Sequence, residues 1–83
     1  LYAFVGLERI GGVMVYDISN PYGPQFVTYL NNRNFAAAVT SAEAGDLGPE
    51  GVSFVPGEQM ADGVARLIVG NEVSGTTTVY RVE

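Results

Sequence analysis

Short runs of β-branched and aromatic residues alternate with glycine, proline and polar residues along most of this chain. Runs of this kind between turn-forming residues predict β-strands. We expect six strands, at residues 2–6, 13–18, 25–30, 52–55, 66–70 and 77–82. Several runs, such as Leu67-Ile68-Val69, are apolar without alternation, which indicates a sheet that is covered on both faces.

The segments between the strands predict three kinds of connection. Gly11 and Gly12 are suited to a hairpin turn between the first two strands, because glycine readily adopts positive φ. Residues 19–24 hold two prolines and a glycine and end the second strand. Residues 31–48 form a long polar and alanine-rich connection, in which we predict a short helix at 35–44.

Two stretches of the chain match each other without a gap. Residues 5–16 and 69–80 both begin with Val-Gly-x-Glu, continue to a glycine three residues after the glutamate, and end with Val-Tyr. The offset between them is constant at 64 residues. A repeat of this kind predicts that the chain contains copies of one supersecondary unit.

Small stacked sheets built from a repeat favour an all-β fold, specifically a fragment of about two blades of a β-propeller. We expect residues 1–30 to supply strands B, C and D of one blade, whose inner strand is missing. Residues 31–48 then connect the blades, and residues 49–83 supply strands A, B and C of the last blade. A β-sandwich is the alternative, but it does not explain the repeat. The chain is expected to be a C-terminal fragment rather than an independent domain.

Composition limits the partners of this chain. It has 83 residues, with no cysteine for a disulfide and no histidine, so a small all-β unit of this kind is expected to pack on more protein. We expect that protein to be the remaining blades of the same propeller or other chains of the parent assembly. Nine acidic residues against four arginines give a net charge of −5, which argues against nucleic-acid binding. The apolar runs are too short for a membrane span, which needs about 20 residues.

Four carboxylates are the candidate chemistry. In a propeller, the turns between strands B and C and the connections between blades lie at one end of the disc, which places Glu8, Glu50, Glu72 and Asp46 there. Oxygen-rich clusters of this kind suit Ca²⁺ or Mg²⁺, so we expect a metal site. The structural alternative is that Glu8 and Glu72 accept hydrogen bonds from the backbone of their own turns, and that Asp46 is a loop or cap residue.

Two arginines are also assigned to this end. Arg9 and Arg33 are expected to pair with nearby acids, the alternative being that they clamp a phosphate. Without cysteine or histidine, neither a Cys-His pair nor a Ser-His-Asp triad can be assembled from this segment alone.

Several segments resemble a known family. Gly11-Gly12-Val13-Met14-Val15-Tyr16-Asp17-Ile18-Ser19-Asn20-Pro21, followed by Pro24-Gln25-Phe26-Val27, resembles the LVIVD-type propeller repeat. Residues 5–9, 29–33, 45–51 and 71–76 together are similar to the C-terminal part of the choice-of-anchor I family. That family includes bacterial cell-surface propellers, is related to mesenchyme-specific cell-surface glycoproteins of biomineralising animals, and has members that carry the name alkaline phosphatase.

This resemblance implies a function and a location. It implies a secreted or cell-surface propeller, which we expect to act as a binding or structural module; Ca²⁺ is the ion expected from the carboxylates described above. The alternative is that the chain is part of a metal-dependent, alkaline-phosphatase-like phosphoesterase. The resemblance identifies no catalytic residue in this chain.

Overall fold

The computed structural model describes residues 1–83. The chain forms six β-strands and two single-turn 3₁₀ helices. In chain order these are β1 (Tyr2–Gly6), β2 (Val13–Asp17), β3 (Gln25–Leu30), η1 (Ala42–Ala44), β4 (Pro49–Val55), η2 (Gly57–Gln59), β5 (Ala65–Asn71) and β6 (Thr76–Val82). Neither helix has the length and apolar character needed to cross a membrane.

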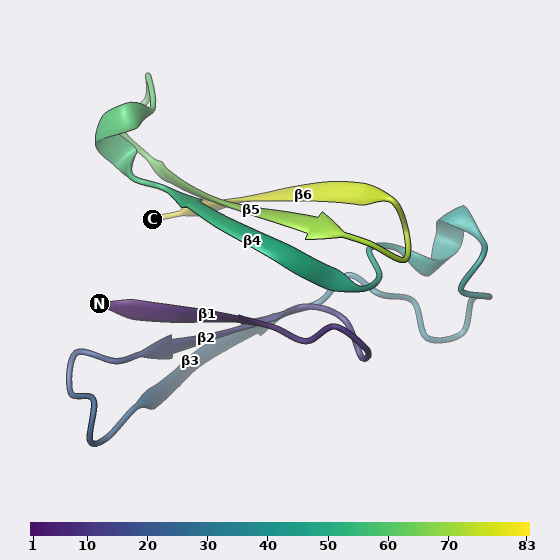
Figure 1. Cartoon of the computed structure of the whole chain (residues 1–83), viewed down its shortest axis with the longest axis horizontal. Helices are drawn as coiled ribbons and strands as arrows, with labels where there is room; N and C mark the ends of the chain where they lie inside the picture. The colour runs from purple at the N-terminus through teal and green to yellow at the C-terminus, as the bar shows by residue number, and fades with distance from the viewer.

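The strands form two antiparallel sheets of three strands each, ordered β1-β2-β3 and β4-β5-β6 (Figure 1). In both sheets, strands that follow each other in the chain are hydrogen-bonded neighbours. We call them sheet 1 and sheet 2. The predicted all-β class is therefore confirmed, and two small meander sheets agree with about two propeller blades.

All six predicted strands are present, but the predicted helix at 35–44 is wrong. Only the single turn η1 forms within this segment. The backbone N–H of Asn34 donates to the carbonyl oxygen of Ala44 at 2.8 Å, which folds the segment back on itself as a loop. An alanine-rich stretch of this length is too short to be a stable helix without an apolar face to pack.

One strand begins earlier than predicted. β4 starts at Pro49 rather than at residue 52, with a β-bulge between Pro49 and Gly51. A proline is tolerated here because it is the first residue of an edge strand. The bulge leaves the intervening Glu50 without a partner in the register of the sheet.

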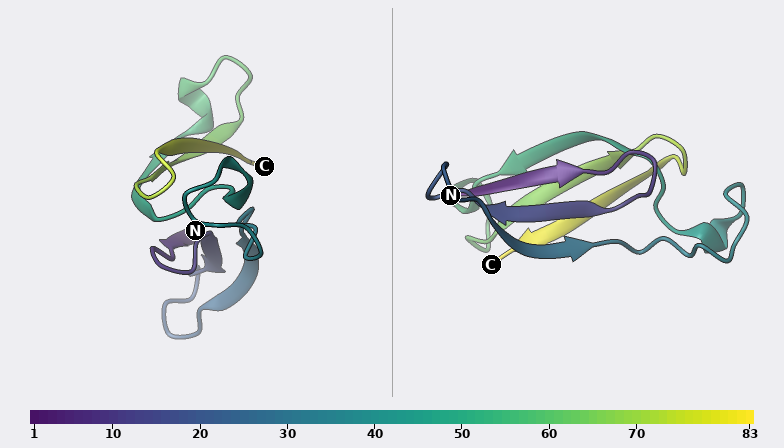
Figure 2. Two further views of the ribbon diagram at one scale, coloured as in Figure 1. Left: turned by 90° about the vertical axis from the view of Figure 1, so that its right-hand side faces the viewer. Right: turned by 90° about the horizontal axis from the view of Figure 1, so that it is seen from below.

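The two sheets stack face to face, as the views in Figure 2 show. Val13 of β2 packs with Leu67 and Val69 of β5, and all three are almost completely buried. Three partly buried residues surround this cluster: Phe4, Tyr80 and Val82. The inner sides of both sheets therefore form one small apolar core.

The turns that matter for function lie at one end of the molecule. The β1–β2 turn, the β5–β6 turn and the connection 31–48 are all at this end, whereas both chain termini lie at the other (Figure 1). We call it the turn end. The connection is fixed to the β5–β6 turn, because the backbone N–H groups of Glu72 and Val73 donate to the carbonyls of Gly48 and Leu47 at 2.8 and 3.2 Å.

Candidate metal centre

Glu8 lies in the β1–β2 turn, which is closed by its own backbone. The N–H of Gly11 donates to the carbonyl oxygen of Leu7 at 2.8 Å. The N–H of Leu7 donates to the carbonyl oxygen of Gly12 at 3.0 Å. Gly11 and Gly12 have φ of 95° and 83°, values that glycine adopts without strain. The turn is thus held without the side chain of Glu8, which is exposed to solvent.

Glu72 occupies the equivalent place in the β5–β6 turn. The N–H of Gly75 donates to the carbonyl oxygen of Asn71 at 2.9 Å, and Gly75 has a φ of 68°. Neither Glu8 nor Glu72 accepts a hydrogen bond from its own turn. The structural alternative for these two glutamates is therefore not observed.

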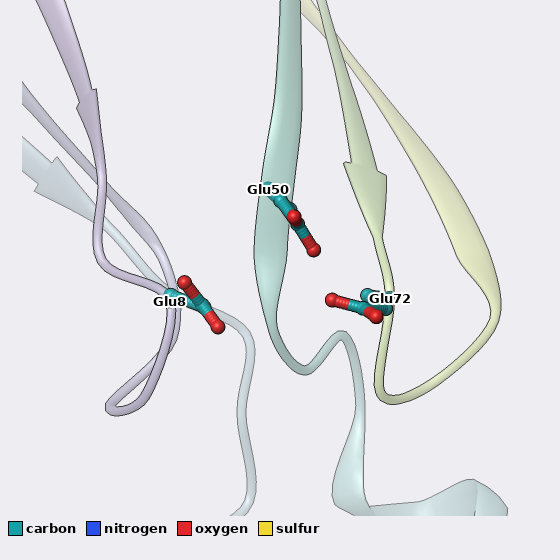
Figure 3. Close-up of side chains that lie close together, drawn as sticks. All are labelled: Glu8, Glu50 and Glu72. Carbon is teal, nitrogen blue, oxygen red and sulfur yellow. The ribbon is translucent and has the colours of Figure 1, made fainter.

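Glu50 reaches the turn end from a different element. It is the extra residue of the bulge at the start of β4, and it is exposed. Bulges commonly redirect a side chain relative to the regular alternation of a strand. Here the side chain of Glu50 points toward those of Glu8 and Glu72 (Figure 3).

The three glutamates converge on one point between the two sheets. One carboxylate oxygen from each of Glu8, Glu50 and Glu72 lies within 4.8 Å of the others. The molecule has two salt bridges, Arg66 with Asp62 and Arg81 with Glu83, so no arginine forms a salt bridge with this group. We call Glu8, Glu50 and Glu72 the acidic triad.

The electrostatics of the acidic triad are those of crowded like charges. A hydrogen bond with Glu72, repulsion from its charge and repulsion from Glu8 together raise the pKa of Glu50 above its ordinary value. The three carboxylates therefore repel one another, and a bound cation would offset this repulsion. The three carboxylate oxygens are close enough to one another to hold one metal ion between them.

Asp46, the fourth residue assigned to this site, is not in the acidic triad. Its two carboxylate oxygens accept hydrogen bonds from the hydroxyl groups of Thr78 and Thr76 at 2.5 and 2.7 Å, and from the amide of Asn32 at 2.6 Å. The bonds from Thr78, Thr76 and then Asn32 lower the pKa of Asp46. Its role is to attach the connection to β6.

The partners of Asp46 were not predicted from the sequence. Asn32 also accepts a bond from the backbone N–H of Asp46 at 2.8 Å, so the two residues hold the ends of the connection together. Thr76 and Thr78 lie on the same side of β6 and point inward, alongside Asn71. Alternate threonines on a strand after a long polar connection are the signal that would have indicated this network.

The arginines of the turn end are not paired with acids, so that expectation is wrong. Arg33 donates to the backbone carbonyls of Arg9 and Ile10 at 2.8 and 3.2 Å, and its guanidinium lies 4.7 Å from the ring centroid of Phe35. Arg9 makes no side-chain hydrogen bond or salt bridge. A cavity of about 270 Å³ beside the acidic triad is lined by Glu8, Arg9 and Arg33 among others.

Comparison of the chain with known protein families, with curated proteins and with solved structures gives no match. Family membership therefore stays a prediction from the segments described above. The acidic triad and its surroundings are the features of the molecule that bear on its function.

Proposed function

We propose that this chain belongs to a secreted or cell-surface β-propeller of the choice-of-anchor I type and serves as a binding or structural module that holds Ca²⁺ at its turn end. The observation that carries the proposal is the convergence of Glu8, Glu50 and Glu72 within 4.8 Å. The three come from two turns and a bulge on both sheets. A cation bound here would link sheet 1 to sheet 2 at the end where the apolar core stops.

Ligand flexibility favours Ca²⁺ over Mg²⁺ at the acidic triad. Ca²⁺ takes six to eight oxygen ligands at about 2.3–2.6 Å in adaptable geometry, whereas Mg²⁺ demands a near-ideal octahedral shell at about 2.0–2.1 Å. Three oxygens from exposed side chains that lie within 4.8 Å of one another can share one Ca²⁺ without meeting a strict geometry. The exposure of all three glutamates leaves room for water as the remaining ligands.

The same exposure sets the expected affinity. A site with three solvent-exposed carboxylates and no buried ligand is not rigid enough for the tight binding of cytosolic buffers. We expect a dissociation constant of about 10⁻⁴–10⁻³ M, the range of extracellular calcium modules. Binding in this range would suit a role outside the cell, where the net charge of −5 would also suit a matrix or surface layer.

Thermal melting tests the proposal. The chain is melted in Ca²⁺ at several millimolar and in a chelator, and the same pair of melts is recorded for Glu50→Gln. We expect Ca²⁺ to raise the melting temperature of the natural chain and to have little effect on Glu50→Gln. The matched control is Glu58→Gln, which removes one exposed charge in η2, at the other end, and keeps the calcium response. Equal melting temperatures with and without Ca²⁺ in the natural chain would disprove the site.

A metal-dependent phosphoesterase is the second candidate, and the cavity beside the acidic triad favours it. Arg9 lines this cavity and its guanidinium is free to pair with a phosphoryl group, while a cation on the triad would stabilise the same negative charge. The chain offers no cysteine or histidine, so the attacking group would have to be a water or come from elsewhere. A chromogenic phosphomonoester with Ca²⁺ present tests it: turnover that is lost in Arg9→Gln and in Glu50→Gln supports the enzyme, and no turnover supports the module.

A further inference from the structure

Equivalent positions in the two sheets differ in burial, because the two sheets meet through opposite faces. The repeat aligns Val5 with Val69 and Val15 with Val79, so each pair occupies the same place in the two sheets. Val69 is 1% exposed and Val5 is 43% exposed, whereas Val15 is 8% exposed and Val79 is 58% exposed. The side that sheet 2 buries is thus the side that sheet 1 exposes, and the reverse also holds.

Strand register extends this relation to whole faces. On sheet 1, Val5 shares the exposed side with Ala3, Met14, Tyr16 and Tyr29, whose places follow from the β1–β2 and β2–β3 pairing. The repeat aligns Ala3 with Leu67 and Tyr16 with Tyr80 of sheet 2. Leu67 lies in the core, and Tyr80 packs against it. The exposed side of sheet 1 therefore has the pattern of a core-forming face. We call it face P.

The exposed side of sheet 2 is the counterpart. It carries Ile68 and Val79, which are opposite each other on β5 and β6, with Thr77 and Arg81 in the same layer. Ile68 aligns with Phe4, and Val79 aligns with Val15. Phe4 and Val15 both lie on the inner side of sheet 1. We call this side face Q. The arginines on it are paired with acids, since Arg66 contacts Asp62 and Arg81 contacts Glu83.

We propose that face P of one chain packs on face Q of a second copy of the chain, in the same way that sheet 2 packs on sheet 1 within one copy. The buried side of sheet 2 has the pattern of face P, and the buried side of sheet 1 has the pattern of face Q. The contact inside one copy therefore joins the two kinds of face, and one face of each kind is left exposed. Such a contact is head-to-tail, so it continues into a ring or an open stack instead of stopping at a two-fold dimer. The large apolar side chains on face P, including Phe26 packed edge-to-face on Tyr16, are those expected of an interface.

This inference goes beyond the calcium site and does not depend on it. In a propeller, faces P and Q are the faces on which neighbouring blades pack, so the inference assigns those blades to further copies of this chain. It uses only the repeat, the strand register and the burial of the two sheets. Loss of Ca²⁺ binding leaves it unchanged, and assembly measured in chelator separates the two proposals.

Sedimentation velocity of the 83-residue chain in chelator, from low micromolar to near millimolar concentration, provides the test. The natural chain should form a concentration-dependent series of species larger than a dimer. Val5→Glu blocks face P and Val79→Glu blocks face Q, and both substitutions are at exposed positions, so each variant alone should be monomeric. A mixture of the two should give a dimer and nothing larger, because each variant keeps one good face. Val73→Glu, an exposed control in the β5–β6 turn, should assemble like the natural chain.

A second measurement removes any dependence on the folding of these variants. The chain has no cysteine, so Val5→Cys and Thr77→Cys each carry a single thiol. Inside one copy, Val69 and Val13 belong to the same buried cluster. The repeat aligns Val5 with Val69 and Thr77 with Val13, so Val5 of one copy and Thr77 of the next should lie close together. A short bismaleimide added to the mixture should join Val5→Cys to Thr77→Cys well above the statistical share. A folded natural chain that stays monomeric at all concentrations, or cross-linking at the statistical share, would overturn the proposal.

Discussion

The ring of Phe4 on β1 stacks on the ring of Phe54 on β4, with centroids 6.0 Å apart and planes inclined by 19°. The two residues belong to different sheets and are 50 positions apart in the chain. Aromatic pairs of this geometry contribute about 0.5–1.5 kcal/mol beyond the area they bury. The pair extends the apolar core toward the end that holds the chain termini, and so helps to hold the two sheets together there.

The first prediction concerns Phe54. Phe54→Ala should lower the free energy of unfolding by about 1–2 kcal/mol, less than the ~3–5 kcal/mol for a fully buried phenylalanine, because the side chain is half exposed. Urea denaturation followed by circular dichroism measures the change. Tyr22→Ala is the control, since Tyr22 is 98% exposed and should have no effect. Equal losses in both variants would contradict the role of the stacked pair.

The second prediction concerns the pH dependence that Asp46 gives to stability. Its pKa in the folded chain is lowered, so its stabilising contribution is fully present above the pKa of the unfolded chain and is lost as pH falls through the lower, folded pKa. Asp46→Asn should cost about 1–2 kcal/mol near neutral pH, because the carboxylate loses three charge-assisted bonds on a partly exposed site.

Urea titrations of both chains between pH 3 and pH 7 check this. The difference between the natural chain and Asp46→Asn should shrink as the pH falls below the ordinary range of aspartate. A difference that is constant with pH would show that the carboxylate charge of Asp46 is not what stabilises the connection.

The third prediction concerns Glu50 without a cation. The pKa of Glu50 is raised, so its contribution to stability is present below the pKa of the unfolded chain and is lost as pH rises through the higher, folded pKa. In chelator, Glu50→Gln should therefore be more stable than the natural chain at neutral pH and should show a weaker decline between pH 4 and pH 7. Melting curves over this range measure it. A natural chain that is the more stable of the two at neutral pH in chelator would mean that the acidic triad is not under repulsion.

The fourth prediction separates two glycines with similar backbone angles. Gly12 and Gly75 both have positive φ, so alanine at either position is strained by about 1–2 kcal/mol. A Cβ on Gly12 would also collide with the carbonyl oxygen of Leu30 and lie 2.7 Å from the Cβ of Asn31, whereas a Cβ on Gly75 meets nothing within 4 Å. Gly12→Ala should cost clearly more than Gly75→Ala in urea denaturation. Equal costs would place the β1–β2 turn farther from β3 than it is here.

The sequence predicted the strands well because each is a dense apolar or β-branched run between turn residues. It also placed Glu8 and Glu72 together, because a gapless repeat puts them at the same point of two equivalent turns. The contribution of Glu50 was foreseen from its place before the innermost strand, but the β-bulge that turns its side chain toward the other two was not. A bulge depends on the pairing of β4 with β5, which no local pattern encodes.

Asp46, Arg9 and Arg33 show where sequence reasoning was limited. All three were assigned to the turn end by topology, and their residue types allow several partners. Asp46 is instead held by threonines on β6, some 30 residues away, and Arg33 by backbone carbonyls and an aromatic ring. Which polar groups meet in a loop is decided by how the loop docks, and the loop 31–48 has no periodic pattern to show it.

Isothermal titration calorimetry measures directly whether the acidic triad binds Ca²⁺. We expect one ion per chain, a dissociation constant of about 10⁻⁴–10⁻³ M, and loss of the binding heat in Glu50→Gln combined with Glu72→Gln. The doubly substituted control Glu43→Gln with Glu58→Gln removes the same charge elsewhere and should bind as the natural chain does. No binding heat in the natural chain, or equal binding by both double variants, would contradict a calcium site at Glu8, Glu50 and Glu72.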